Sequence, residues 1–319
     1  MPPRAPIPIT EVVKGIFKIG PLETHSRTPN TSPHLVVGEK QAAIVEFGES
    51  GQAHDLLEAI KEIGVDRDRI AYLIASHIHL HHIAGVDVLL KELPKSKMVI
   101  HQRGVRYVVE PTRLNESTFQ AWGKDSGCPQ IAPVPQDRIW GISGGEVIDL
   151  GGRELEVVET LGHSPHHIAI FDRLTKALFA GDAAGVLGLG SERASPDIRP
   201  PFFDVDLAAK SLQRLRALNP SAILLFGYGG ISHSPQKTLQ WSEEDIRTVE
   251  RICREGMKNK ESAKEIGRKV GEYYAKVGAS MPKEGVEVMR ERGIGVGGSL
   301  PIGMCAFLMK QDPSLEMPK

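Results

Sequence analysis

The segment His77-Ile78-His79-Leu80-His81-His82 places four histidines within six positions of the chain. It follows an apolar β-type run, Ile70–Ala75, and precedes a run with helical spacing, Gly85–Leu93. The imidazole nitrogen is the commonest protein ligand for zinc and a good one for iron, and His clusters at strand ends mark metal sites. The segment therefore predicts a metal centre, with a solvent-exposed His-rich turn as the alternative.

Two later segments repeat this placement of a polar residue directly after a strand. His163 follows the predicted strand Glu154–Val158, and Asp182 follows the predicted strand Ala177–Ala180. A Gly-Asp pair alone is most often a turn. Since every candidate ligand comes from a strand-to-loop junction, the side chains are expected to meet at one edge of a sheet, where binding sites of layered α/β folds lie.

The order and spacing of these residues resemble the metallo-β-lactamase superfamily, whose signature is H-x-H-x-D-H, then Gly-His, then Gly-Asp, then a final His. The resemblance covers Val12–Ser232. The segment His101–Leu114 and the stretch Pro200–Asp204, before a Leu-rich helix, are similar to a prokaryotic subgroup with a C-terminal helical extension. The resemblance implies an α/β fold, an αββα sandwich, extended by C-terminal helices.

The strand and helix order read from periodicity agrees with that architecture. Strands are predicted at Gly15–Ile19, His34–Val37, Ala42–Phe47, Ile70–Ala75, Met98–His101, Glu146–Asp149, Glu154–Val158, His167–Phe171, Ala177–Ala180 and Ala222–Phe226, and helices at Ala53–Ile63 and Gln102–Leu114. We assign residues 1–240 to the metallo-β-lactamase-like domain and residues 241–319 to a helical C-terminal extension.

The C-terminal extension shows three amphipathic runs and a Gly-rich break. Ser242 is predicted to cap the first helix, the second spans Ala263–Val277, and the third spans Lys283–Arg292. Gly293–Gly303 is predicted to be a loop before a short terminal helix, Met304–Met309. These apolar faces should pack on the catalytic domain or on a second subunit, and we expect a homodimer.

The resemblance also implies the roles of the candidate ligands. His77, His79 and His163 would bind a first metal ion, Asp182 would bridge, and His82 would bind a second ion.

Two positions depart from the family pattern, both on the side of the second metal. His81 replaces the usual Asp, and Tyr228 stands where the final His is usual, although His233 could fold back to replace it. Loss of the Asp leaves Asp182 as the only certain anionic ligand, so the site is more positive. A phenol binds zinc poorly at neutral pH, whereas phenolate suits iron. Either one ion is held well beside a weak second site, or His81 and Tyr228 complete an altered coordination of the second ion.

Four further polar residues have predicted supporting roles. Glu46 stands where the family often has an Asp, and this resemblance implies that it accepts a hydrogen bond from a ligand imidazole. His167 matches a His that is common after the family's Gly-His motif, and it is expected to pack near the ligands without binding metal. His166 is expected to lie at the surface or pocket rim. His101 is expected to be a hydrogen-bonded structural residue, with a place in the pocket lining as the alternative.

These residues favour a metal-dependent hydrolase. The metal would lower the pKa of a bound water, and the hydroxide would attack an ester, thioester, lactone or phosphoester. Asp182, His81 and Tyr228 are the predicted catalytic residues, and one or two zinc ions are the predicted cofactor, with iron or manganese as alternatives. The alternative functions are an iron-dependent redox or oxygen-handling protein and a catalytically weak ligand-binding or sensor protein.

Composition limits the partners. The 319 residues are 40% apolar, which suits a folded core, and 39 Lys and Arg residues nearly balance 40 Asp and Glu residues. No overall charge attracts nucleic acid or a membrane surface, so a small-molecule substrate is expected. The sequence shows no signal peptide or bilayer-length apolar stretch, which predicts a cytoplasmic protein. Cys128, Cys253 and Cys305 form no metal motif.

Overall fold

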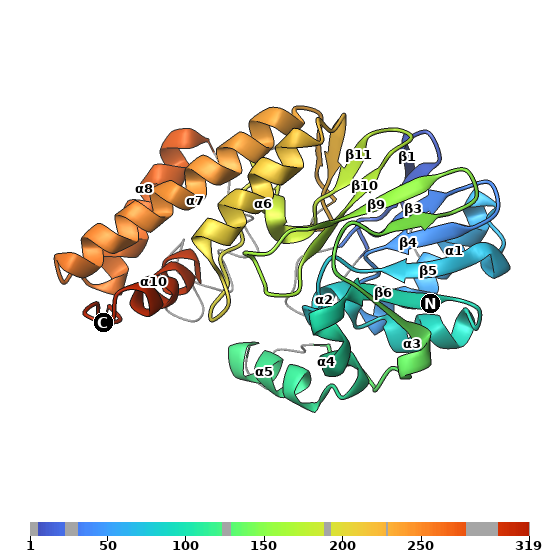
Figure 1. Cartoon of the computed structure of the whole chain (residues 1–319), viewed down its shortest axis with the longest axis horizontal. Coiled ribbons are helices and arrows are strands. Elements are labelled where there is room, and N and C mark those ends of the chain that lie inside the picture. The colour runs from blue at the N-terminus through green and yellow to red at the C-terminus, as the bar shows by residue number, and fades with distance from the viewer. Residues whose placement is uncertain are drawn as a thin grey trace.

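Two β-sheets lie face to face between two layers of helices (Figure 1). The computed structural model describes residues 6–22, 31–122, 129–187, 193–227, 229–278 and 299–318. The first sheet has the order β1-β2-β3-β4-β5-β6-β7, and the second has the order β13-β12-β11-β10-β9-β8. The predicted αββα sandwich with C-terminal helices is therefore confirmed.

The strands of the first sheet are β1 (Ile9–Val13), β2 (Ile16–Ile19), β3 (His34–Val37), β4 (Ala42–Val45), β5 (Ile70–Ile74), β6 (Lys97–His101) and β7 (Ile139–Ile142). Those of the second sheet are β8 (Val147–Asp149), β9 (Glu154–Glu159), β10 (Ile168–Asp172), β11 (Ala177–Phe179), β12 (Ala222–Leu224) and β13 (Ile231–Ser232). The strands β1, β7 and β13 were not among the sequence predictions.

Strand β10 shows why the sheets are covered on both faces. All five of its residues are buried. Ile168 and Ile170 belong to the core between the sheets, whereas Ala169 and Phe171 belong to the core under the outer helices. Because successive strand residues point to opposite faces, an uninterrupted apolar run stabilises a strand buried on both sides.

The outer helices divide between the two sheets (Figure 1). Residues of α1 (Ala53–Ile63) and α3 (Val86–Glu92) share a core with the first sheet. Residues of α6 (Val205–Ala217), α7 (Pro235–Lys258), α8 (Ala263–Val277) and α10 (Ser299–Gln311) share a core with the second. None of the helices in the described ranges is both long and apolar enough to span a membrane.

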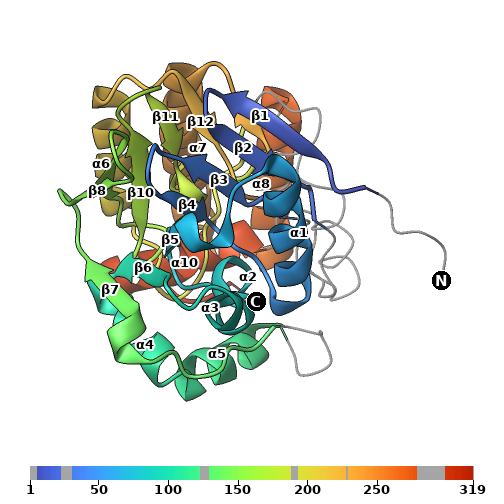
Figure 2. The same ribbon diagram turned by 90° about the vertical axis from the view of Figure 1, so that its right-hand side faces the viewer.

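The parallel strands of the first sheet position the site. Strands β4, β5, β6 and β7 pair in parallel, so their carboxyl ends lie at one edge of the sheet. The four-histidine segment follows β5 at this edge. Beyond β6, at the bottom of Figure 2, lie α4 (Val105–Val109) and α5 (Thr112–Trp122).

The structure corrects several helix predictions. The helix predicted over Gln102–Leu114 is broken before Pro111, because proline disfavours helical backbone in the residue that precedes it. Helix α7 begins at Pro235, so the predicted cap at Ser242 is wrong. The Ser242 hydroxyl is buried and donates to the carbonyl oxygens of Ala184, at 2.8 Å, and Thr238, at 2.9 Å.

The terminal predictions have mixed outcomes. Helix α10 begins at Ser299, so the last part of the loop predicted over Gly293–Gly303 is helical, and the prediction is wrong there. The helix predicted at Lys283–Arg292 lies outside the described residues. The division between residues 240 and 241 falls inside α7, and it stays a prediction.

Candidate metal centre

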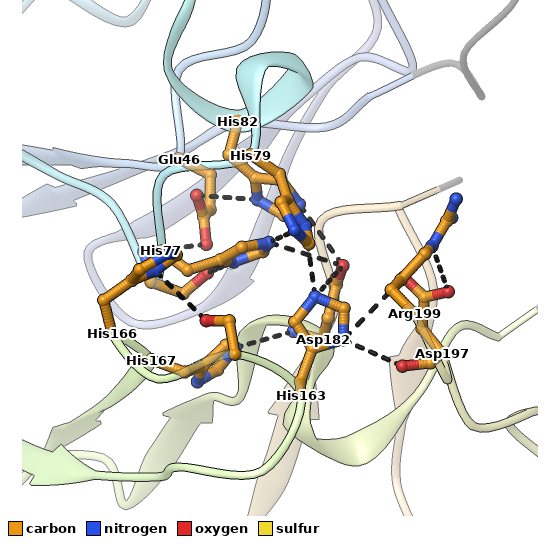
Figure 3. A network of polar contacts seen from close by, with 12 residues as sticks. Glu46, His77, His79, His82, His163, His166, His167, Asp182, Asp197 and Arg199 are labelled. Carbon is orange, nitrogen blue, oxygen red and sulfur yellow. Dashed lines mark hydrogen bonds and ion pairs between the residues drawn. The ribbon is translucent and has the colours of Figure 1, made fainter. Parts of the chain in front are cut away.

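The candidate ligands come from three segments, each directly after the end of a strand (Figure 3). His77 and His79 lie in the turn after β5, and the short helix α2 (Leu80–Ile83), which carries His81 and His82, begins directly afterwards. His163 lies in the loop after β9, and Asp182 lies in a 3-10 turn after β11. The strand ends therefore bring residues about a hundred positions apart to one place.

A first group contains His77, His79, His163 and Asp182, whose ligand atoms all lie within 4.8 Å of one another. The His79 Nδ1 atom is 2.7 Å from His77 Nε2 and 3.1 Å from His163 Nε2. The Asp182 Oδ2 atom is 3.8 Å from His77 Nε2 and 3.7 Å from His163 Nε2. Three imidazole nitrogens thus face one carboxylate oxygen.

A second group contains His81, His82 and Asp182, with its ligand atoms also within 4.8 Å of one another. The His82 Nε2 atom lies 3.5 Å from Asp182 Oδ2 and has no hydrogen-bond partner in the described part of the chain. Asp182 is common to both groups, which is the placement that a bridging ligand requires.

Neighbouring groups orient two of the imidazoles. The His163 Nδ1 atom donates to the carbonyl oxygen of Asp197 at 2.8 Å, and His82 Nδ1 donates to Glu46 Oε2 at 2.9 Å. A neutral imidazole carries one proton, so a proton held at Nδ1 leaves the Nε2 lone pair facing the centre. This arrangement fits a transition-metal ion, because the hydrogen bonds at Nδ1 orient both rings with Nε2 toward the centre.

Burial and neighbouring charges favour the metal-binding protonation states. Burial and the surrounding imidazoles hold the pKa values of His77, His79 and His81 well below the ordinary value, so these rings are neutral at physiological pH. Burial alone would raise the pKa of Asp182, but His82 and the other imidazoles hold it well below its usual range.

His82 differs from the other imidazoles. Burial lowers its pKa, but the carboxylates of Glu46 and Asp182 outweigh burial and raise the pKa to about 10. A ring between two carboxylates favours a positive charge at Nε2, which a proton or a metal ion can supply. Neutral imidazoles together with carboxylates are a donor set that suits zinc or iron.

The supporting residues lie where the sequence predicted. Glu46 accepts the His82 hydrogen bond described above. The backbone N–H of Asp182 donates to His167 Nε2 at 3.2 Å, and His167 Nδ1 lies 2.7 Å from the Thr160 hydroxyl. His101 is buried, accepts a hydrogen bond from the Arg103 backbone N–H at 3.0 Å, and lies 3.3 Å from Glu159. His166 lines a cavity beside the centre.

Sequence reasoning missed Asp197, which orients His163. The group of Asp197 that accepts the His163 hydrogen bond is its backbone carbonyl, 34 positions after His163 in the sequence. A residue of any type has such a carbonyl. No spacing signal could have identified it. Tyr228 lies outside the described residues, and His233 is exposed and belongs to neither ligand group found among the described residues. The predicted role of Tyr228 stays a prediction.

Comparison with known proteins gives matches that span most of the chain. The chain is 26% identical over 205 residues to the metallo-beta-lactamase fold-containing protein ST1585 of Sulfurisphaera tokodaii, covering 62% of this chain and 72% of that protein. It is 27% identical over 192 residues to the hydroxyacylglutathione hydrolase GloC of Haemophilus influenzae, covering 60% of this chain and 81% of the relative.

A solved structure shows the same fold. The metallo-beta-lactamase family protein TTHA1429 of Thermus thermophilus superimposes with a TM-score of 0.64 at 18% identity, covering 89% of this chain and 96% of that one. The family model described as the metallo-beta-lactamase superfamily matches residues 28–228, which is more than half of the chain. The chain therefore belongs to the metallo-beta-lactamase superfamily.

Proposed function

We propose that this protein is a metal-dependent hydrolase of small-molecule acyl compounds, namely esters, thioesters or lactones, with phosphoesters as a further class. The observation that carries the proposal is the convergence of His77, His79 and His163 on the Asp182 carboxylate. The relationship to a hydroxyacylglutathione hydrolase supports a hydrolytic reaction.

The proposed ligand sets are His77, His79, His163 and Asp182 for one ion, and His81, His82 and Asp182 for a second. A bound divalent ion of this kind lowers the pKa of a water ligand and polarises the substrate carbonyl. Asp182 offsets the positive charge, and the hydrogen bonds from His163 to Asp197 and from His82 to Glu46 keep the ligand rings in place.

The test is elemental analysis of the protein purified without added metal, combined with ester and thioester hydrolysis assays. We expect at least one zinc, iron or manganese ion per chain. The double variant His79→Ala/His163→Ala should lose both the metal and the hydrolysis, whereas His54→Ala, an exposed histidine on α1, should lose neither. A metal-free native protein, or unchanged metal content in the double variant, would remove the proposal. Iron with an absorption band and no hydrolysis would favour the redox alternative.

His81 permits a separate prediction about the second ligand group. The centroids of the His81 and His82 rings are 4.2 Å apart. The substitution His81→Asp replaces the neutral His81 imidazole with a carboxylate, which restores the family residue. A second anion lowers the cost of placing two divalent ions side by side. We expect the metal content per chain to rise towards two in His81→Asp, measured at equal free metal concentration. Equal occupancy in the wild type and the variant would contradict this.

A further inference from the structure

A second candidate site lies beside the metal centre, in a cavity of about 620 Å³. One wall is formed by the turn after β6 and by α4, with Arg103, Arg106 and Tyr107 among its residues. The other wall includes Pro165 and His166, from the loop that follows β9. Arg103 belongs to the His101–Leu114 segment that the sequence analysis singled out, and the proposed hydrolysis leaves this segment without a role.

The cavity and the metal centre share the loop that contains His163 and His166. His163 belongs to the first ligand group, and His166 lines the cavity three positions later. The Arg103 Nη1 atom donates to the Pro165 carbonyl oxygen at 3.2 Å, which joins the two walls. Strands β5 and β6 are parallel neighbours, so the turns after them open on the same edge of the sheet. A molecule in the cavity therefore lies beside the loop that carries the candidate ligand His163.

The cavity wall carries positive charge that the described residues leave unbalanced. Among the described ranges, neither Arg103 nor Arg106 forms an ion pair with a carboxylate, although many other arginines do. The Arg106 guanidinium lies over the Tyr107 ring at 4.5 Å and donates to its hydroxyl. A guanidinium has five N–H donors in a planar fork, which matches a carboxylate or phosphate. Within the described residues, each of these two side chains uses only part of its donors on the protein.

We propose that this cavity binds an anionic group of the substrate, a carboxylate or a phosphate, through Arg103 and Arg106. The inference rests on the proposed function and narrows its substrate class to anionic acyl esters and thioesters. In the hydrolysis, water adds to the acyl carbon, the C–O or C–S bond breaks, and the departing alcohol or thiol takes up a proton. Arg103 and Arg106 act on substrate position and not on this step.

The kinetic test compares two 4-nitrophenyl esters of similar length, the anionic mono-4-nitrophenyl glutarate and the neutral 4-nitrophenyl pentanoate. In Arg103→Gln and Arg106→Gln, KM for the glutarate ester should rise about tenfold with kcat and metal content unchanged. Both constants for the neutral ester should stay as in the wild type. Arg113→Gln removes an exposed arginine of α5 outside the cavity lining, and should change neither ester. Equal KM values in wild type and cavity variants would overturn the proposal.

Calorimetric titration with glutarate and with inorganic phosphate gives a readout that needs no hydrolysis, and its two arms distinguish the two kinds of anion. At least one anion should bind the wild type and Arg113→Gln alike, and bind Arg103→Gln and Arg106→Gln about tenfold more weakly. If the anion binds in this way while neither ester is hydrolysed, the hydrolase proposal fails and the anion site stands. If esters are hydrolysed but the anion binds Arg103→Gln and Arg106→Gln as tightly as the wild type, the anion-site proposal is wrong and the hydrolase proposal stands.

Discussion

Glu46 contacts two parts of the metal centre through its two carboxylate oxygens. Its Oε2 atom accepts from His82 at 2.9 Å, and its Oε1 atom accepts from the backbone N–H of Ser76 at 3.2 Å. The backbone φ of Glu46 is 57°, a left-handed conformation that non-glycine residues rarely adopt. The surrounding contacts therefore hold a strained residue in place to orient a ligand, which is a common feature of functional sites.

We predict that Glu46→Gln weakens metal binding by about 10- to 100-fold, because the amide has a similar shape but no charge to hold the His82 proton. Competition with a chelator of known affinity measures the change. Glu58→Gln, at an exposed position of α1, is the control. Unchanged affinity in Glu46→Gln would show that the hydrogen bond does not affect the centre.

His34 on β3 makes a second prediction at the residue scale. Burial, with a smaller contribution from Lys18, lowers its pKa to about 3. In the unfolded chain, His34 has a pKa of about 6.5 and binds a proton as the pH falls below that value. In the folded protein, His34 stays neutral until about pH 3. Stability is therefore complete above the unfolded pKa and is lost as pH falls from 6.5 towards 3, by about 2 kcal/mol at pH 5.

The measurement is urea unfolding between pH 7.5 and pH 5 for the wild type and His34→Leu. The loss of unfolding free energy on acidification should be smaller in His34→Leu by about 2 kcal/mol. His54→Leu, at an exposed site, should keep the wild-type slope. Parallel pH profiles for wild type and His34→Leu would refute the prediction.

At the scale of elements, a buried ion pair joins the strands β9 and β10 to the first sheet. Arg153 directly precedes β9, and its Nε and Nη2 atoms donate to Asp172 at 3.0 and 2.8 Å. Its Nη1 atom donates to the carbonyl oxygens of Lys14 and Val37, each at 3.1 Å. The guanidinium therefore connects the two sheets at the end of the sandwich.

Asp172→Asn should lower the free energy of unfolding by about 3–5 kcal/mol, because it leaves the Arg153 charge buried without its partner. Chemical denaturation checks this. The matched control is Glu154→Gln, which breaks the exposed pair with Arg173 and should cost about 0–1 kcal/mol. A loss in Asp172→Asn as small as that of the control would mean that the pair contributes little to stability.

At the scale of the whole molecule, the C-terminal helices complete the core over the second sheet. Val249, Cys253 and Met257 of α7 are buried in one cluster with Leu212 of α6 and Phe171 of β10. Apolar residues of α8 and α10 belong to the same cluster. The predicted packing of the extension on the rest of the chain is therefore confirmed, and the expected homodimer stays a prediction that light scattering can check.

Truncation after Gln240 should yield a chain that is insoluble or lacks cooperative unfolding, because it exposes the apolar face of α6. Expression in the soluble fraction and a thermal melt are the measurements. Val249→Asp, in full-length protein, should destabilise by the same route, whereas Arg251→Asp on the exposed side of α7 should not. A soluble truncated protein with a wild-type melting temperature would show that residues 1–240 fold alone.

The sequence by itself was sufficient for the sandwich and for the ligand candidates. Local patterns indicated strands such as Ile70–Ala75 and polar residues directly after them that gather at a sheet edge, and the resemblance of these motifs to the family implied the sandwich. The supporting roles of Glu46 and His167 followed from the resemblance to the family pattern, and that of His101 followed from its position at a strand end. Strands β1, β7 and β13 were missed, because their short or partly exposed runs carry weak periodicity.

Only the tertiary structure determined how distant segments meet. It set the boundaries of α7 and α10, which depend on packing against other helices more than on capping residues such as Ser242. It brought the Asp197 carbonyl to His163, and it set Arg103 and Arg106 across a cavity from His166. Such contacts leave no trace in local sequence, because their energy comes from groups that become neighbours only after the sheets have packed.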